Sequence, residues 1–188
     1  MAWLVVGVLL WMAAHLSVTA ARGVRGNFIS KMGIGPYKGV FALVIVASIV
    51  LMVIGWRSTA AETVYEPPEW GALAAAALMP IAFVLFAVAQ GKSNIRRFIR
   101  HPMLTGMMVW GVAHLLANGD IRSVILFGGM VLWAALEIPI INNRLGDWQK
   151  PEKSTFMADL RPVAIALVIY VIAVFAHPYV IGVSASPH

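Results

Sequence analysis

Six apolar stretches separated by short polar connections dominate the chain. They cover residues 2–21, 37–55, 70–90, 102–117, 121–141 and 162–178. An α-helix rises about 1.5 Å per residue, so about 20 apolar residues cross the roughly 30 Å of hydrocarbon in a bilayer. The pattern predicts an all-α integral membrane bundle of six transmembrane helices, or of five with one short or re-entrant segment, because the fourth stretch is short. We expect residues 1–188 to form a single domain.

The composition supports the membrane class. Hydrophobic residues make up 61% of the chain and charged residues 12%, whereas about 25% of the residues are charged in a soluble domain. The chain contains no cysteine, which excludes disulfides, covalent attachment of c-type haem and cysteine-bound iron–sulfur clusters. Any haem in this protein would therefore be held without a covalent bond.

The positive charge is distributed unevenly between the two ends of the predicted helices. Twelve of the 14 Lys and Arg residues lie in the first, third and fifth connections, and only Arg57 and Arg122 lie at the opposite end. Basic residues concentrate in the cytoplasmic loops of membrane proteins. We therefore expect both termini to face away from the cytoplasm. The net charge of +6 then reflects topology, and we expect membrane lipid rather than nucleic acid as a partner.

Two apolar stretches each contain a histidine in the pattern Trp-x-x-Ala-His-Leu, which places His15 after Trp11 and His114 after Trp110. Residues four apart share one face of a helix, so each histidine should carry a tryptophan one turn before it. Ionisable side chains inside a membrane are expensive and are functional candidates by default. We interpret His15 and His114 as axial ligands of one b-type haem between the first and fourth helices; the alternative is two structural histidines that are hydrogen-bonded to carbonyl groups across helices.

Other residues around these histidines are candidates for the same haem site. The two tryptophans would stack beside the porphyrin, two glycines would let its flat face approach, and two arginines at the basic end would pair with its propionates: Trp11, Trp110, Gly106, Gly111, Arg22 and Arg100. Depth is a difficulty, because His15 lies roughly 10 Å and His114 roughly 20 Å from the basic end. Glu137 either pairs with Arg144 or handles protons.

The whole chain resembles the NnrU family of bacterial membrane proteins. The matching residues are the run from His101 to Gly106, the run from Trp110 to Asp120, residues 125–129, residues 66–70 and an early His15-Leu-Ser17. The resemblance implies a bacterial inner (cytoplasmic) membrane protein linked to nitrite and nitric oxide metabolism in denitrification. It also implies a relation to the plastid 15-cis-zeta-carotene isomerase, which binds haem b (iron protoporphyrin IX) through histidines that match His15 and His114.

The resemblance to the isomerase is incomplete. Where the isomerase has a cysteine three residues before its second histidine, this chain has Gly111. A switch of ligand from imidazole to thiolate is therefore impossible here, which weakens the case for carotenoid isomerisation. The resemblance leaves open nitric oxide sensing or processing, electron transfer, and isomerisation of a lipid-soluble polyene.

Two further interpretations come from other classes of protein. The run Arg100-His-Pro-x-x-x-Gly106, followed by Glu137 on a later helix, is similar to membrane methyltransferases that use S-adenosylmethionine, although Leu104 replaces their tyrosine. A haemless assembly factor for denitrification enzymes is the third interpretation. Within the haem interpretation we expect His114, in the denser motif, to be the firmly held ligand and His15 to be displaced more easily.

Overall fold

Six long helices form the protein, and the apolar stretches predicted all six. The computed structural model describes residues 1–181, with side chains through residue 179. The helices are α1 (Ala2–Ala20), α3 (Ile34–Ser58), α4 (Gly71–Val88), α5 (Pro102–Ala117), a continuous helix built from α6 (Ile121–Ser123), η2 (Val124–Gly128) and α7 (Gly129–Leu145), and α8 (Met157–Ile181). Five of them are long and apolar enough to cross a membrane, and α5 is shorter. The all-α, multi-pass membrane bundle is confirmed.

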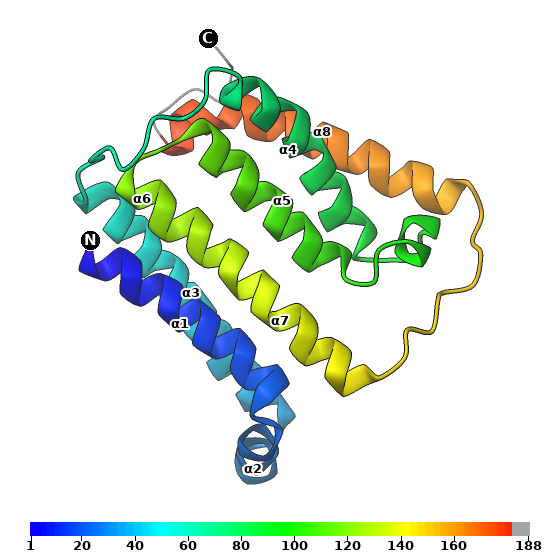
Figure 1. Ribbon diagram of the computed structural model, residues 1–188. Helices are drawn as coiled ribbons and strands as arrows, with labels where there is room; N and C mark the ends of the chain where they lie inside the picture. The colour runs from blue at the N-terminus through cyan, green and yellow to red at the C-terminus, as the bar shows by residue number, and fades with distance from the viewer. Residues whose placement is uncertain (182–188) are drawn as a thin grey trace.

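A short helix that the sequence did not predict joins the first two membrane helices. The first connection was predicted as a loop, but α2 (Arg22–Met32) occupies most of it. None of the α2 residues is buried, and α2 projects from the end of the α1–α3 pair (Figure 1). Gly33 ends it with a φ of 84°, a conformation that favours glycine. This helix brings basic side chains back toward the end of α1.

The helices pack as two antiparallel pairs with α7 between them. α1 packs mainly on α3, α4 packs mainly on α5, and α7 contacts both α1 and α5 (Figure 1). A Cβ atom built on Gly55 would lie 2.2 Å from the backbone nitrogen of Leu4, so the α1–α3 contact requires a glycine there. Small residues that let backbones approach are typical of helix contacts in membranes. The central cluster of buried side chains is Leu4, Val8, Met52, Leu104, Met130, Trp133 and Ala134.

The outer surface of the bundle is strongly apolar. Large side chains on α3 and α8 are exposed, with Leu43 at 70% and Phe175 at 72% of their full areas. In water such surfaces would be unfavourable, but lipid tails are as apolar as these side chains. α8 contacts mainly α4, so most of its surface faces lipid.

Hydrogen bonds fix both ends of α5. At its start, Arg100 donates to the carbonyl of Gly146 over 2.8 Å, and Nε2 of His101 donates to Oδ1 of Asn142 over 2.8 Å. At its end, the Tyr65 hydroxyl donates to the carbonyls of Leu115 and Asn118. The short helix α5 is therefore tied to α7 at one end and to the loop before α4 at the other.

Asp120 begins the continuous fifth membrane helix. Its carboxylate accepts from the backbone N–H groups of Arg122 and Ser123 and from both of their side chains. Burial would raise the pKa of Asp120, but the hydrogen bonds from Ser123 and Arg122 outweigh it and hold the pKa below its ordinary value. An isolated bridge between Asp120 and Thr63 is the β-structure found among the described residues.

The fifth membrane helix contains one irregular turn. Between α6 and α7, residues Val124–Gly128 form a π-helix, which inserts one extra residue into the turn. Phe127 lies in this turn and is almost fully buried. Such turns are frequent at functional sites, so the surroundings of Phe127 are a candidate functional region.

Candidate functional site

Both candidate histidines have the same local arrangement. Nδ1 of His15 lies 2.9 Å from the carbonyl oxygen of Trp11, and Nδ1 of His114 lies 2.8 Å from that of Trp110. A carbonyl oxygen only accepts, so Nδ1 carries the proton in each ring and donates it. Nε2 is then the nitrogen with a free lone pair, which is the state that a metal-binding histidine requires. No hydrogen bond to Nε2 of either ring is found among the described residues.

Each histidine also contacts the tryptophan that precedes it. The ring centroids of Trp11 and His15 are 4.3 Å apart, and those of Trp110 and His114 are 4.8 Å apart. The expected pairing of each histidine with a tryptophan on one helix face is therefore confirmed. Among the described residues, the indole nitrogen Nε1 of Trp11 is buried and has no hydrogen-bond partner.

His15 borders a pocket at the basic end of the bundle. The pocket has a volume of about 330 Å³ and is open on one side. It lies among α1, α2, α3 and α7, and we call it the His15 pocket. Its lining residues are His15, Val18, Thr19, Arg25, Tyr37, Lys38, Phe41 and Glu137. The ring of His15 also packs against Trp133, at 4.8 Å, and against Phe41, at 5.7 Å.

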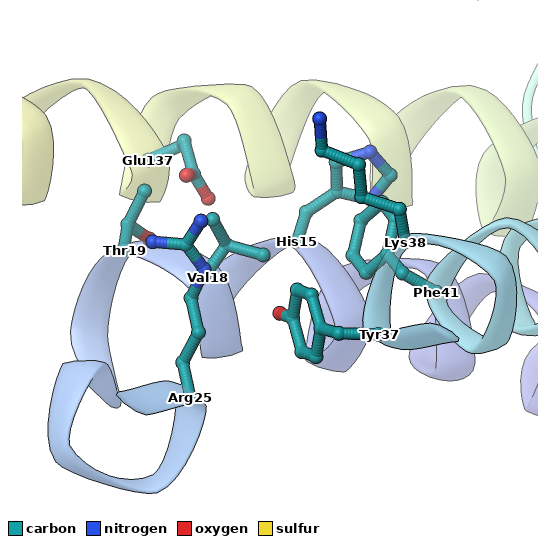
Figure 2. A pocket seen from close by; sticks show the side chains of 8 residues that line it. All are labelled: His15, Val18, Thr19, Arg25, Tyr37, Lys38, Phe41 and Glu137. Atoms are coloured by element: carbon teal, nitrogen blue, oxygen red, sulfur yellow. The ribbon is translucent and has the colours of Figure 1, made fainter. Parts of the chain in front are cut away.

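Charged side chains of both signs line the His15 pocket. In Figure 2, Glu137 from α7 and Arg25 from α2 point toward one another beside Thr19. Glu137 is only 5% exposed, and its carboxylate accepts a hydrogen bond from Nε1 of Trp133 over 3.2 Å. Nε of Arg25 is buried without a partner among the described residues. A buried donor without a partner is costly, so the pocket favours a ligand that carries an acceptor group.

His114 lies at the opposite end of the bundle, where its side chain is half-buried, as that of His15 is. Its ring stacks on Phe127, with centroids 4.3 Å apart and an interplanar angle of 22°. Trp110 contacts the same phenylalanine at 4.8 Å. His177 on α8 interacts electrostatically with His114. Neither of the two pockets described for this protein includes His114 in its lining.

The structure places the two histidines apart. α7 lies between α1 and α5 (Figure 1), and His15 and His114 contact different residues of the fifth membrane helix, Trp133 and Phe127. Six residues separate these two aromatic side chains, which corresponds to roughly 9 Å along the helix axis. Trp11 and Trp110, the tryptophans that precede the two histidines, both pack against the central cluster of buried side chains. Ligation of one iron by both histidines stays a prediction.

The two glycines proposed for the approach of a porphyrin contact neighbouring helices instead. A Cβ on Gly106 would lie 2.9 Å from the ring of Phe86, and a Cβ on Gly111 would lie 2.6 Å from Val131. Both positions are therefore occupied by protein side chains in this arrangement. Their role here is close packing of α5 on α4 and on the fifth membrane helix.

The two arginines proposed for the propionates do not line the pocket. Arg22 is exposed at the start of α2, and Arg100 is bonded to the end of α7. Arg25, one turn after Arg22, lines the pocket together with Lys38. The sequence could not single out Lys38, Tyr37 and Phe41, because only the α2 turn brings the start of α3 toward His15.

The chemistry of the His15 pocket fits one face of a haem. The imidazole of His15, with its free Nε2, could bind an iron. The flat aromatic neighbours could contact a macrocycle, and the two cationic side chains could pair with its carboxylates. The volume lies at the lower end of the range for small-molecule sites, about 300–1,000 Å³. A porphyrin is larger than this pocket and would use its open side.

A search of curated proteins and a search of solved structures each gave no match. The family model described as NnrU protein matches residues 3–185, which is nearly the whole chain. The protein therefore belongs to the NnrU family.

Proposed function

We propose that this protein is a membrane-embedded b-type haem protein in which His15 is an axial ligand. The observation that carries the proposal is the fixed Nδ1 proton of His15, which leaves Nε2 free beside a pocket with an unpaired arginine nitrogen. A haem held there would supply reversible binding of a diatomic gas or transfer of one electron. Family membership and the resemblance to a histidine-ligated haem protein support this assignment.

Each residue of the His15 pocket would have a separate role in binding. The Trp11 carbonyl orients the imidazole, while Trp133 and Phe41 pack against its ring and exclude water. Arg25 and Lys38 offer positive charge to carboxylates at the basic end of the bundle. Glu137 supplies a buried carboxylate that accepts a hydrogen bond from Trp133 and lines the same pocket.

Nitrite- or nitric oxide-linked metabolism is the role we propose for the bound group. If haem is bound, His15 would hold it, and the group would supply the binding of a small diatomic molecule. The structure gives no specific support to the methyltransferase interpretation. Arg100 and His101, which carry that resemblance, are both bonded to the end of the fifth membrane helix.

The absorption spectrum of the purified protein tests the proposal. We expect a Soret band, complete extraction of the pigment by acid–acetone, and loss of at least nine-tenths of the band in His15→Ala. His114→Ala should retain most of the band, and His101→Asn serves as a control histidine that does not line the pocket. Absence of a Soret band in protein expressed with an adequate haem supply would contradict the proposal. Equal loss in His15→Ala and His114→Ala would instead favour shared ligation.

We also propose that the protein lies in the bacterial inner membrane with both termini in the periplasm. The twelve-to-two distribution of basic residues supports this orientation. Alkaline phosphatase fused after His188 should be active, and a green fluorescent protein fusion at the same position should be dark. The reverse pair of results would contradict the orientation.

A further inference from the structure

A second pocket lies between the end of α4 and the start of α8, away from both histidines. Its volume is about 590 Å³. We call it the α4–α8 groove. Its polar lining is Gln90, Lys92, Ser154, Thr155 and Arg161, and its apolar lining includes Val88, Met157 and Ile165. Nothing in the proposed haem function uses these residues.

A network of hydrogen bonds fixes the rim of the groove. The Asp159 carboxylate accepts from the Ser93 hydroxyl, from the Asn94 backbone N–H and from the Asn94 side-chain amide, each over 2.7 Å. Asn94 also exchanges two hydrogen bonds with the backbone of Ser154, over 3.1 and 2.8 Å. The connection after α4, which includes η1 (Asn94–Arg97), is therefore held against the start of α8. The groove is a built feature of the fold and does not depend on a loose loop.

Two cationic side chains at this rim have no acidic partner. Lys92 and Arg161 both line the groove and form no ion pair or hydrogen bond within the described part of the chain. Asp159, the nearest carboxylate on α8, is occupied by Ser93 and Asn94. The rim therefore presents positive charge and side-chain hydroxyl groups to a ligand.

Pro162 leaves one further polar group available in the groove. Proline has no N–H, so the carbonyl of Ala158, four residues earlier, lacks its usual helical donor. Both residues line the groove. This carbonyl can accept a hydrogen bond from a hydroxyl group, which an anionic headgroup such as phosphatidylglycerol carries.

The floor of the groove is apolar and leads toward the membrane interior. Met157, Arg161 and Ile165 are spaced four residues apart, so they lie along one face of α8. Ile165 lies one turn deeper in α8 than Arg161, and Val88 of α4 lies in the same pocket. A charged rim above an apolar floor matches a phosphate with an attached acyl chain. A soluble phosphate has no apolar part that could contact the floor.

We propose that the α4–α8 groove binds an anionic phospholipid, with its phosphate at Lys92 and Arg161 and one acyl chain along the apolar floor. Basic pockets between membrane helices are typical sites for anionic headgroups. α8 contacts little else besides α4, so a lipid in this groove would also hold α8 in place. The site is independent of haem and needs no catalytic residue.

Native mass spectrometry of the full chain tests this site. The protein would be released from detergent micelles containing phosphatidylglycerol or phosphatidylcholine with the same acyl chains. We expect retention of one phosphatidylglycerol molecule in preference to phosphatidylcholine. The double variant Lys92→Gln/Arg161→Gln should bind phosphatidylglycerol roughly 25-fold more weakly, since each basic side chain contributes about fivefold. The double variant Lys92→Arg/Arg161→Lys keeps both positive charges and should therefore retain phosphatidylglycerol.

The matched control is Arg144→Gln/Lys150→Gln, which removes the same charge from exposed residues outside the groove. This control should retain phosphatidylglycerol as the unmodified chain does. An equal loss in the control, or equal retention of phosphatidylcholine, would overturn the site. Displacement of the lipid by inorganic phosphate at millimolar concentration would also overturn the proposal, because it would indicate a site for the soluble anion.

Discussion

His15 and His114 stand in the same six-residue pattern, yet of the two only His15 lines one of the pockets described above. Each ring donates Nδ1–H to the carbonyl of its own tryptophan, and each contacts that tryptophan. Beyond this shared turn, His15 borders a pocket with an unpaired arginine nitrogen, whereas His114 is stacked on Phe127. Local sequence thus sets the proton position of each ring, and tertiary neighbours decide whether a ligand can reach it.

Which histidine would hold a haem more firmly stays a prediction, and the comparison leads us to a different proposal from the one that the sequence favoured. The denser motif predicted His114 as the firmly held ligand and His15 as the weaker one. The pocket, the cations and the buried carboxylate all lie beside His15, so we now propose His15 as the principal ligand. A dense sequence motif here reflects close helix packing, as Gly111 against Val131 illustrates.

The strongest test truncates the aromatic partner of each histidine. Trp133→Ala and Phe127→Ala should each lower the free energy of unfolding by about 3–5 kcal/mol, because each removes a buried aromatic side chain. Trp133→Ala should raise hydrogen exchange mainly in α1, and Phe127→Ala mainly near residues 110–118. Mass spectrometry of exchanged peptides in detergent would measure both. If each variant loosened both regions equally, the two regions would form one unit and the comparison would fail.

A smaller effect is expected when a methyl group is added at a helix contact. Gly55→Ala brings a Cβ within 2.2 Å of the Leu4 backbone, which should cost about 1–3 kcal/mol or more and move α1 with His15. Gly111→Ala meets Val131 at 2.6 Å and should disturb the His114 region instead. Denaturation by SDS would give the stability, and cross-linking of cysteines introduced on α1 and α3 would report helix separation. Gly26→Ala, which meets nothing within 4 Å, is the control.

Removal of one hydroxyl group should sharpen the comparison further. Tyr65→Phe leaves the carbonyls of Leu115 and Asn118 without a donor, so we expect a loss of about 1 kcal/mol and faster exchange near the end of α5. Tyr37→Phe, in the lining of the His15 pocket, removes no hydrogen bond found among the described residues. It should therefore leave the stability within about 0.5 kcal/mol of the unmodified chain. Equal losses in the two variants would contradict the assigned role of Tyr65.

The smallest effect should come from acid. The pKa of Asp120 is held below its ordinary value, so its contribution is fully present above pH 3.8 and is lost as the pH falls through the lower folded pKa. Residues 118–123 should then exchange faster in acid, before the α1–α3 pair does. Asp120→Asn should remove most of this pH dependence while retaining part of the helix cap. An unchanged pH dependence in Asp120→Asn would assign the acid sensitivity to another group.

The sequence predicted the helices far better than the site. Apolar runs locate membrane helices because each run must satisfy its own backbone hydrogen bonds in lipid. The same physics says little about which helices are neighbours, since any apolar surface is acceptable to lipid. The position of α7 between α1 and α5 was therefore not predictable, and neither was the separation of His15 from His114. Spacing within one helix correctly paired each histidine with its tryptophan, because that contact depends on the helix period alone.

The extra residue in η2 also changes the direction in which the side chains after it point around the helix. Each residue of an α-helix advances the side-chain direction by about 100°, so one additional residue rotates everything after it relative to everything before it. Phe127 lies within the π-turn and faces His114, whereas Trp133 and Glu137 follow it and face His15. Because of this rotation, one helix directs Phe127 toward His114 on α5, and Trp133 and Glu137 toward His15 on α1. Deletion of one residue within residues 124–128 would turn Trp133 and Glu137 away from His15, although the deleted residue itself does not line the His15 pocket.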